Sequence, residues 1–470
     1  MASRSNGKRA VTGYRCTECG WSTVKWVGRC GECQAWGSVT EVGQPTARTT
    51  AAPVGEPARP IGQVDMSRAS AETTGVPEFD RVLGGGLVPG AVVLVAGEPG
   101  VGKSTLLLDV AARTARSGRT VLYVSGEESA AQVRGRAERI GALADRLLLA
   151  AETDLGTVLG HVEHAGPDLL VVDSVQTIAS AEVDGQAGNV SQVREVTGTL
   201  IQVAKSRGVA VLLVGHVTKD GSVAGPRVLE HLVDAVVQFE GDRHSRLRLV
   251  RAVKNRFGPT DEVGCFELRD SGIVGLADPS GLFLSRSAAP VPGTCVTVAM
   301  EGRRPLVTEL QSLITASSLP SPRRTTSGLD ASRLAMILAV LEKRSGLPAG
   351  TRDVFAATVG GMRVTEPAAD LAILLSLASS AMDRPLARDV VALGEVGLSG
   401  ELRPVPALGP RLTEAARLGF RYALVPEGQS DVTPPAGITP VAVPDVRSAV
   451  EAMGQLCGSR AAAAMEAATA

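Results

Sequence analysis

Short aliphatic runs divide the middle of the chain into predicted strands. Residues 92–96, 120–125, 168–173 and 209–215 are apolar stretches rich in valine and leucine, the pattern of strands buried inside a parallel sheet. Residues 103–117 instead carry leucine, valine and alanine at helical spacing, and Gly118 predicts where that helix stops. Residues 246–249 alternate between arginine and leucine, as an antiparallel strand does. The pattern predicts an α/β domain.

The composition changes this picture little. Apolar residues make up 44% of the 470 residues, charged residues 21% and aromatic residues 3%, which is typical of globular protein with aliphatic cores. The net charge of -1 means that any contact with nucleic acid must come from local basic patches. The start of the chain lacks the order of a signal peptide, and the longest uncharged run, residues 82–97, is too short to span a membrane. We therefore expect a cytoplasmic protein with no membrane partner.

Two CxxC pairs near the start predict a metal site. The pairs are ten residues apart, and two such knuckles surround one tetrahedral Zn²⁺ with four thiolates, which supplies the folding energy that so short a module lacks. A pair of redox dithiols is the alternative. The four predicted zinc ligands are Cys16, Cys19, Cys30 and Cys33. All three tryptophans fall in or beside this module, either as packing or as an exposed contact surface: Trp21, Trp26 and Trp36.

A phosphate-binding loop joins the first strand to the first helix. The match to GxxxxGK[ST] runs through Gly97, Glu98, Pro99, Gly100, Val101, Gly102, Lys103, Ser104 and Thr105. The glycines let backbone N–H groups wrap the phosphates, Lys103 reaches the β and γ oxygens, and Ser104 ligates Mg²⁺. Asp173 ends a buried strand, so it is predicted to be the second Mg²⁺ ligand, with a simple strand-end cap as the alternative. The implied cofactors are ATP and Mg²⁺.

These features resemble the RecA/DnaB class of P-loop motors. In that class a glutamate just after the second strand activates water, which by position is Glu127, with Glu128 as the second choice. The class also keeps a polar γ-phosphate sensor where His216 follows its strand, although a lone histidine can equally be structural. RecA-type proteins thread DNA past the loops that correspond to residues 179–192 and 219–226. Four nearby cations are candidates for DNA phosphates: Arg194, Lys205, Lys219 and Arg227.

The segment KNRFG, residues 254–258, is the sharpest family marker. Together with the four-cysteine module, GEPGVGKS and YVSGEES, it resembles the bacterial RadA family over nearly the whole chain. The resemblance implies an ATP-driven motor for recombination and repair that branch-migrates intermediates on single-stranded and branched DNA. It also implies a ring, expected to be a hexamer, and partners such as RecA or the replicative helicase. In related rings Arg256, with Lys254, would be a finger that reaches the neighbouring subunit's γ-phosphate; a solvated basic turn is the alternative.

The last third of the chain resembles the Lon protease domain, in residues 361–370 and 394–405. The position of Lon's nucleophile holds Ala368 and that of its lysine base falls near Gly409, while Thr365 or Ser376 would need a relocated base. Proteolysis is therefore not expected, and the domain is predicted to build an oligomer and to present cations to phosphates. The candidate cations are Arg303, Arg304, Arg323, Arg324 and Arg333.

The predicted organisation is a zinc ribbon at residues 1–42, a linker at 43–70, a RecA-like P-loop ATPase domain with a parallel sheet at 71–286, a Lon-protease-like α+β domain without its catalytic dyad at 287–457, and a flexible tail at 458–470. The predicted function is that of a DNA-dependent ATPase. A Lon-type protease and a KaiC-like signalling ATPase are the alternatives.

Overall fold

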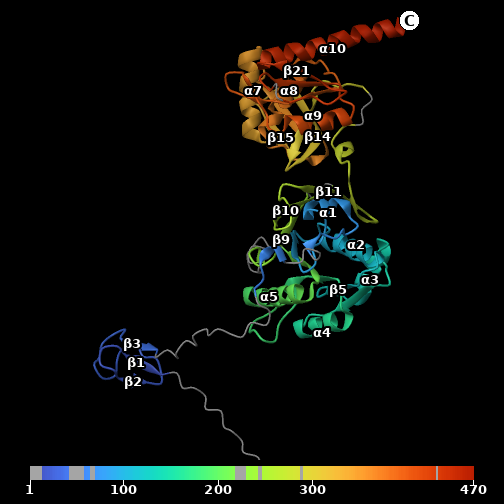
Figure 1. Ribbon diagram of the computed structural model, residues 1–470. Helices are drawn as coiled ribbons and strands as arrows, with labels where there is room; N and C mark the ends of the chain where they lie inside the picture. The colour runs from blue at the N-terminus through green and yellow to red at the C-terminus, as the bar shows by residue number, and fades with distance from the viewer. Residues whose placement is uncertain are drawn as a thin grey trace, which may run out of the picture. The chain divides into compact units, whose positions relative to one another are not determined.

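The computed structural model describes residues 13–41, 58–63, 69–216, 229–241, 246–285, 289–429 and 432–469 (Figure 1). The chain forms two compact units, Met1–Asp65 and Met66–Ala470. In the first unit, β1 (Tyr14–Cys16) lies between β2 (Ser22–Thr23) and β3 (Val39–Glu41) in a small antiparallel sheet, and the single turn η1 (Ile61–Gln63) follows. Cys16, Cys30 and Val39 form its buried cluster, which is a very small core for a folded module.

The second unit begins with a nine-stranded sheet. Its order is β12-β11-β10-β9-β4-β8-β7-β5-β6. The strands are β4 (Val92–Gly97), β5 (Val121–Ser125), β6 (Leu147–Ala151), β7 (Leu169–Asp173), β8 (Ala210–His216), β9 (Ala235–Glu240), β10 (Leu247–Asn255), β11 (Val263–Arg269) and β12 (Gly272–Gly275). The six strands from β9 to β6 are parallel, whereas β10, β11 and β12 join the sheet antiparallel. The predicted parallel sheet and the antiparallel strand after it are thus present.

Helices cover both faces of this sheet. They are α1 (Pro77–Leu83), α2 (Lys103–Arg116), α3 (Ala130–Arg139), α4 (Leu155–Ala165) and α5 (Val190–Arg207), with the single turn η3 (Val175–Thr177) before α5. Along β4, Val93 and Val95 belong to the core shared with α1 and α2, whereas Val92 and Leu94 belong to the core shared with α4 and α5. Because both faces are buried, the strands are continuous apolar runs rather than alternating ones.

The remaining part contains a mixed seven-stranded sheet in the order β15-β16-β14-β13-β17-β20-β21. Its strands are β13 (Thr294–Glu301), β14 (Arg304–Ala316), β15 (Arg324–Ser327), β16 (Arg352–Thr358), β17 (Val390–Ala392), β20 (Tyr422–Pro426) and β21 (Thr439–Val443), and β18 (Glu395–Val396) pairs with β19 (Leu402–Arg403). The helices are α7 (Ala331–Ser345), α8 (Asp370–Met382), α9 (Leu408–Arg417) and α10 (Val446–Thr469), with single turns η4 (Ser280–Leu282), η5 (Val359–Gly361) and η6 (Pro367–Ala369). Leu424 packs with α7, α8 and α10 on one face, and Ala423 packs with α9 on the other. The predicted fold class is confirmed, while the exact domain boundaries and the likeness to Lon stay predictions.

A buried ion pair joins the two sheets of the second unit. Arg304 of β14 forms an ion pair with Glu78 of α1, and it also donates hydrogen bonds to the carbonyl oxygens of Leu276 and Ala277. Both charged side chains are buried, at 8% and 5% exposure. The prediction that Arg304 is a surface cation for phosphates is therefore wrong. A buried charge needs a partner, and here α1 supplies it.

Two further arginines that were predicted to meet phosphates already have partners within the protein. Arg333 forms a bidentate ion pair with Asp370, which is fully buried at the start of α8. Arg324 donates to four backbone carbonyl oxygens, those of residues 323, 349, 350 and 352. Arg303 and Arg323 are exposed, so they are the members of the set best placed to meet a partner.

Within the described ranges, no helix is both long enough and apolar enough to cross a membrane.

Candidate active site

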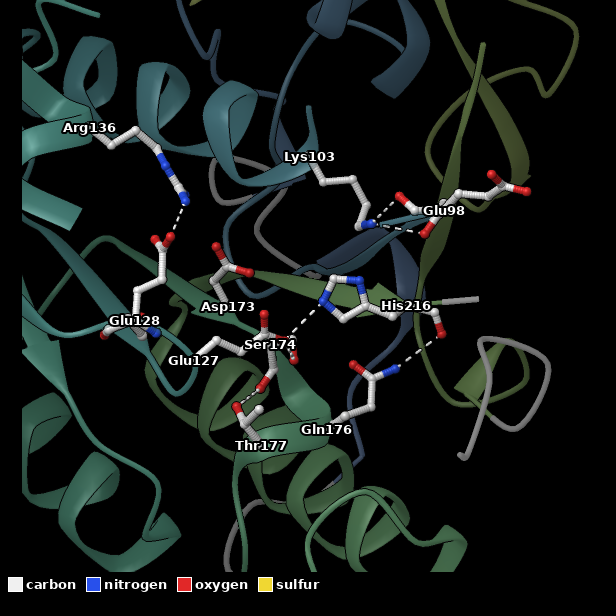
Figure 2. Close-up of polar contacts among 12 residues, drawn as sticks. Glu98, Lys103, Glu127, Glu128, Arg136, Asp173, Ser174, Gln176, Thr177 and His216 are labelled. Atoms are coloured by element: carbon white, nitrogen blue, oxygen red, sulfur yellow. Dashed lines mark hydrogen bonds and ion pairs between the residues drawn. The ribbon is translucent and has the colours of Figure 1, made fainter. Parts of the chain in front are cut away.

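Four parallel strands bring the predicted nucleotide residues to one edge of the nine-stranded sheet. β4 pairs with β8 so that Gly97 lies opposite His216, and β5 pairs with β7 so that Ser125 lies opposite Asp173. The loops that leave these carboxyl ends carry Lys103 and Glu127. Figure 2 shows Lys103, Glu127, Asp173 and His216 around one space. The carboxyl edge of a parallel sheet is where such folds bind their ligands.

The loop between β4 and α2 has the backbone that a phosphate needs. Gly97 and Gly102 have φ values of 155° and 109°, which side-chain-bearing residues rarely adopt. A Cβ on Gly97 would also lie 2.9 Å from the Cβ of Phe239. Helix α2 begins at Lys103, so its free N–H groups face the loop. Loop and helix end together fit the phosphates of a nucleotide.

Lys103 is held inside this loop. Its side chain is 3% exposed, and Nζ donates to the carbonyl oxygens of Gly97 and Glu98 at 2.8 and 2.9 Å (Figure 2). Burial lowers the pKa of Lys103 to about 8, although the carboxylates of Asp173 and Glu127 act in the opposite direction. The partners of the ammonium group are two neutral carbonyl oxygens, which the charged oxygens of a phosphate can replace. Ser104 and Asp173 add the hydroxyl and carboxylate oxygens that suit Mg²⁺.

The two candidate glutamates have different surroundings. Glu127 Oε1 accepts a hydrogen bond from Ser174 Oγ at 2.7 Å and lies 3.0 Å from His216 Nε2 (Figure 2). Glu128 forms an ion pair with Arg136 of α3 instead. Glu127 thus faces the space beside Lys103, and its side chain remains 43% exposed. This geometry favours Glu127 over Glu128 as the group that orients water, an assignment that stays a prediction.

His216 is the last residue of β8, and it contacts both Glu127 and Gln176. Its ring contacts Glu127, and its backbone oxygen accepts a hydrogen bond from Gln176 Nε2 at 3.3 Å. The sensor role stays a prediction, because a histidine bonded to a carboxylate serves either role.

Three residues of this site were not predicted to be functional from the sequence, although Tyr123 is the first residue of the YVSGEES marker. Tyr123 donates its hydroxyl to Asp173 Oδ2 at 2.6 Å, Ser174 binds Glu127, and Gln176 binds His216. Tyr123 lies inside an apolar strand pattern, which hides a polar role. Ser174 directly follows Asp173, so its adjacency to the predicted metal ligand was an available signal.

The KNRFG segment lies at the opposite edge of the sheet. Asn255 pairs with Ala235 at the start of β9, and Ala235 pairs with Val93 at the start of β4. The length of β4, about 3.3 Å for each residue, therefore separates this segment from the phosphate-binding loop. The Arg256 side chain is 58% exposed, and its Nη1 atom lies 3.4 Å from Asp234 Oδ1. At this edge Arg256 is far from the nucleotide site of its own subunit.

Lys254 is turned the other way. Its Nζ donates to the carbonyl oxygens of Glu230 and Val233 at 2.7 and 2.8 Å. The structure therefore separates the two residues of the predicted finger. The Arg256 side chain is largely exposed and pairs with Asp234, whereas that of Lys254 binds the backbone of a neighbouring turn.

The candidate DNA loops are described in part. Residues 179–192 are fixed by Gln192, which bonds the backbone of Ser180 in both directions. Arg194 is exposed, and Lys205 forms an ion pair with Asp234 at 2.7 Å. Lys219, Arg227 and residues 219–226 lie outside the described residues.

The four amino-terminal cysteines converge. All four Sγ atoms lie within 4.8 Å of one another, and the Cys16–Cys33 and Cys19–Cys30 distances are 3.6 Å. A tetrahedral Zn²⁺ with bonds of about 2.3 Å needs sulfur atoms about 3.8 Å apart, so the set fits zinc.

The tryptophans of this module separate into two kinds. Trp21 packs against the buried cysteines, whereas Trp26 and Trp36 are 65% and 77% exposed. The guanidinium of Arg29 lies 5.6 Å from the ring centroid of Trp36. One tryptophan is packing, and two form an exposed surface.

Comparisons with known proteins agree with both modules. Residues 63–222 match the family described as AAA domain, and residues 14–41 match the Rubredoxin metal binding domain. The chain is 52% identical over 462 residues to the DNA repair protein RadA of Mycolicibacterium smegmatis, covering 96% of this chain and 98% of that protein. It is 54% identical to the protein of the same name from Mycobacterium tuberculosis, over 90% of this chain and 89% of the other.

A solved structure, the KaiC-like protein PH0186 from the archaeon Pyrococcus horikoshii, matches 44% of this chain and 99% of its own, with a TM-score of 0.38 and 22% identity. The two relatives cover 96% and 90% of this chain. The chain belongs to the family of the bacterial DNA repair protein RadA.

Proposed function

We propose that the chain is a DNA-dependent ATPase motor that assembles as a ring, expected to be a hexamer. It moves on single-stranded DNA and extends heteroduplex by branch migration at recombination and repair intermediates. The relatives' shared name, DNA repair protein, supports the process in which it acts. The observation that carries the proposal is the meeting of Lys103, Glu127 and Asp173 at the carboxyl edge of one parallel sheet.

Each of these residues has a distinct task in ATP hydrolysis. Lys103 exchanges its two carbonyl partners for β and γ phosphate oxygens and neutralises the charge that develops there. Ser104 and Asp173 would hold Mg²⁺, which would supply positive charge beside the phosphates. Glu127 accepts a hydrogen bond from the attacking water and orients it. Ser174 and His216, which contact the same carboxylate, hold it in place for that water.

Arg256 acts on the neighbouring subunit. Because it lies at the amino edge of the parallel strands, it is remote from its own phosphate-binding loop, yet it is exposed and weakly paired. A head-to-tail ring brings that edge of one subunit to the carboxyl edge of the next. Hydrolysis then depends on assembly.

The last domain supports assembly rather than proteolysis. Ala368 is 2% exposed, and Ser376 is fully buried with its hydroxyl bonded to Ser312 and to the carbonyl oxygen of Ile373. Neither position offers an accessible nucleophile, whereas Thr365 is exposed and would still need a relocated base. We assign this domain to oligomer contacts and, through Arg303 and Arg323, to DNA phosphates.

The zinc ribbon is proposed to contact DNA or another recombination or replication protein, such as RecA or the replicative helicase. Trp26 and Trp36 offer the exposed aromatic surface that such contacts use.

The first test measures ATP hydrolysis with and without single-stranded DNA, for the wild-type chain and for Lys103→Ala and Arg256→Ala. We expect DNA to stimulate the wild type and both variants to be inactive while still assembling. No stimulation by DNA would refute the motor.

Co-assembly of the two variants tests the finger. In a mixed ring some sites combine an intact Lys103 with an intact Arg256 from the neighbour, so about a quarter of the wild-type activity returns if assembly is random. A finger that worked within its own subunit would give no recovery.

A further inference from the structure

Tyr123 is a buried polar group that the proposed hydrolysis does not yet use. It is the third residue of β5, it is 1% exposed, and its ring belongs to the core between the sheet and α2. Its hydroxyl, however, lies 2.6 Å from Asp173 Oδ2. A buried phenol needs a hydrogen-bond acceptor, and this one has the predicted metal ligand as its acceptor.

The register of the sheet produces this contact. Tyr123 pairs with Val171, and Ser125 pairs with Asp173, in the parallel ladder between β5 and β7. Residues two apart along a strand share a face, so Tyr123 and Asp173 both lie on the α2 side of the sheet. Asp173 lies two residues nearer the carboxyl edge than Tyr123 does. The length of the tyrosine side chain covers that step, and a shorter polar residue at this position would not reach the carboxylate.

The contact limits how Asp173 can bind a metal ion. The phenol uses one lone pair of Oδ2 and fixes the orientation of the carboxylate, so that Oδ1 is the freer oxygen for a ligand. Mg²⁺ requires near-octahedral geometry and binds through few carboxylate oxygens, so a carboxylate fixed with one oxygen free suits it. The terminal torsion of aspartate is soft. In the part of the chain that the structure describes, Tyr123 is the only side chain that donates a hydrogen bond to this carboxylate.

We propose that Tyr123 is a positioning residue, which orients Asp173 so that one carboxylate oxygen meets the Mg²⁺ that accompanies ATP. Hydrogen-bond partners of metal ligands tune both orientation and affinity in this way. The proposal rests on the nucleotide site of the proposed function, but it does not depend on DNA or on ring assembly.

The test is Tyr123→Phe, which removes one oxygen and keeps the ring in the core. Tyr422→Phe, in the last domain, is the matched control. The first measurement is binding of a fluorescent ATP analogue to each intact chain, in EDTA and across a Mg²⁺ titration. The second is the paramagnetic signal of Mn²⁺ bound with the nucleotide.

We expect the affinity in EDTA to be unchanged, because Lys103 and the glycine loop are intact. The Mg²⁺ concentration for half-maximal binding should rise roughly 10-fold in Tyr123→Phe, with the Mn²⁺ signal altered and Tyr422→Phe behaving as the wild type. Hydrolysis by Tyr123→Phe should need correspondingly more Mg²⁺ and recover when Mg²⁺ saturates.

Asp173→Asn provides a second variant on the same pathway. In that background Tyr123→Phe should add no further change in Mg²⁺ dependence, because the carboxylate that it orients is gone. A Mg²⁺ titration of Tyr123→Phe that overlays the wild type would overturn the proposal, and so would an equal loss of nucleotide affinity in EDTA. A wild-type chain that bound nucleotide and metal without hydrolysing ATP would refute the proposed function and still test Tyr123.

Discussion

Replacing Lys103 by methionine should make the nucleotide-free chain more stable while abolishing its response to ATP. The lysine ammonium is buried, and its pKa falls from 10.5 to about 8. At about 1.36 kcal/mol for each pH unit, that interval corresponds to roughly 3 kcal/mol against the folded state at pH 7. Water that reaches the phosphate-binding loop reduces this to about 1–2 kcal/mol. Methionine keeps the length of the side chain and removes the charge.

The pH dependence distinguishes this cause from others. Because the folded chain holds the Lys103 proton less tightly than the unfolded chain does, the cost is fully present below pH 8. It decreases as the pH rises through the interval from 8 to 10.5 and is absent above it. The stability advantage of Lys103→Met should therefore shrink by roughly 40% between pH 7 and pH 9.

Urea unfolding of both chains at the two pH values measures the advantage directly. Addition of ATP and Mg²⁺ at about 100 times the dissociation constant should stabilise the wild type by about 2.7 kcal/mol and leave the variant unchanged. A variant that is less stable than the wild type without nucleotide would refute the reasoning. So would an advantage that stays constant with pH, because it would not come from the buried charge.

Three other perturbations separate neighbouring residues or modules. Glu127→Gln should lower the rate of ATP hydrolysis by about 10²–10⁴-fold while ATP still binds. Glu128→Gln only weakens the pair with Arg136, so its hydrolysis rate should stay within a few-fold of the wild type. Equal losses of rate would contradict the assignment. Arg304→Ala leaves the buried Glu78 with only the longer 3.7 Å contact to the half-exposed Arg81 and one backbone N–H, and it should cost about 3 kcal/mol in urea unfolding, the lower end of the range for breaking a buried pair. The exposed Arg303→Ala should cost less than about 1 kcal/mol. Similar costs would argue against a buried pair. Removing zinc with a chelator should shift tryptophan emission to the red, because all three tryptophans lie in residues 21–36 and Trp21 packs on the cysteine cluster. The nine-stranded sheet should keep its circular dichroism signal. An unchanged emission spectrum would exclude a zinc-dependent fold for the ribbon.

The local sequence was enough for the features that depend on adjacent residues. The phosphate-binding loop needs glycines, Lys103 and Ser104 at fixed spacing, because one short stretch of backbone surrounds the phosphates. The zinc set needs only two tight knuckles, and the four cysteines indeed converge. Continuous apolar runs predicted the parallel strands because both faces of that sheet are covered.

Long-range pairing was not readable in the same way. Arg304 had the same appearance in the sequence as Arg303, yet one is buried against Glu78, 226 residues away, and the other is exposed. Which arginine meets a carboxylate depends on how the two sheets pack. No spacing rule connects residues so distant along the chain.

The sequence by itself therefore determined the chemistry that the chain carries: a zinc ribbon, a phosphate-binding loop, and the strands that place Asp173 and His216 beside it. The tertiary structure alone decided which groups meet. It brought Ser174 and His216 to Glu127, Tyr123 to Asp173, and put the KNRFG segment at the far edge of the sheet. The physical reason is that spacing along the chain fixes contacts within one turn or one loop, whereas contacts between strands depend on sheet order and register, which the whole core determines.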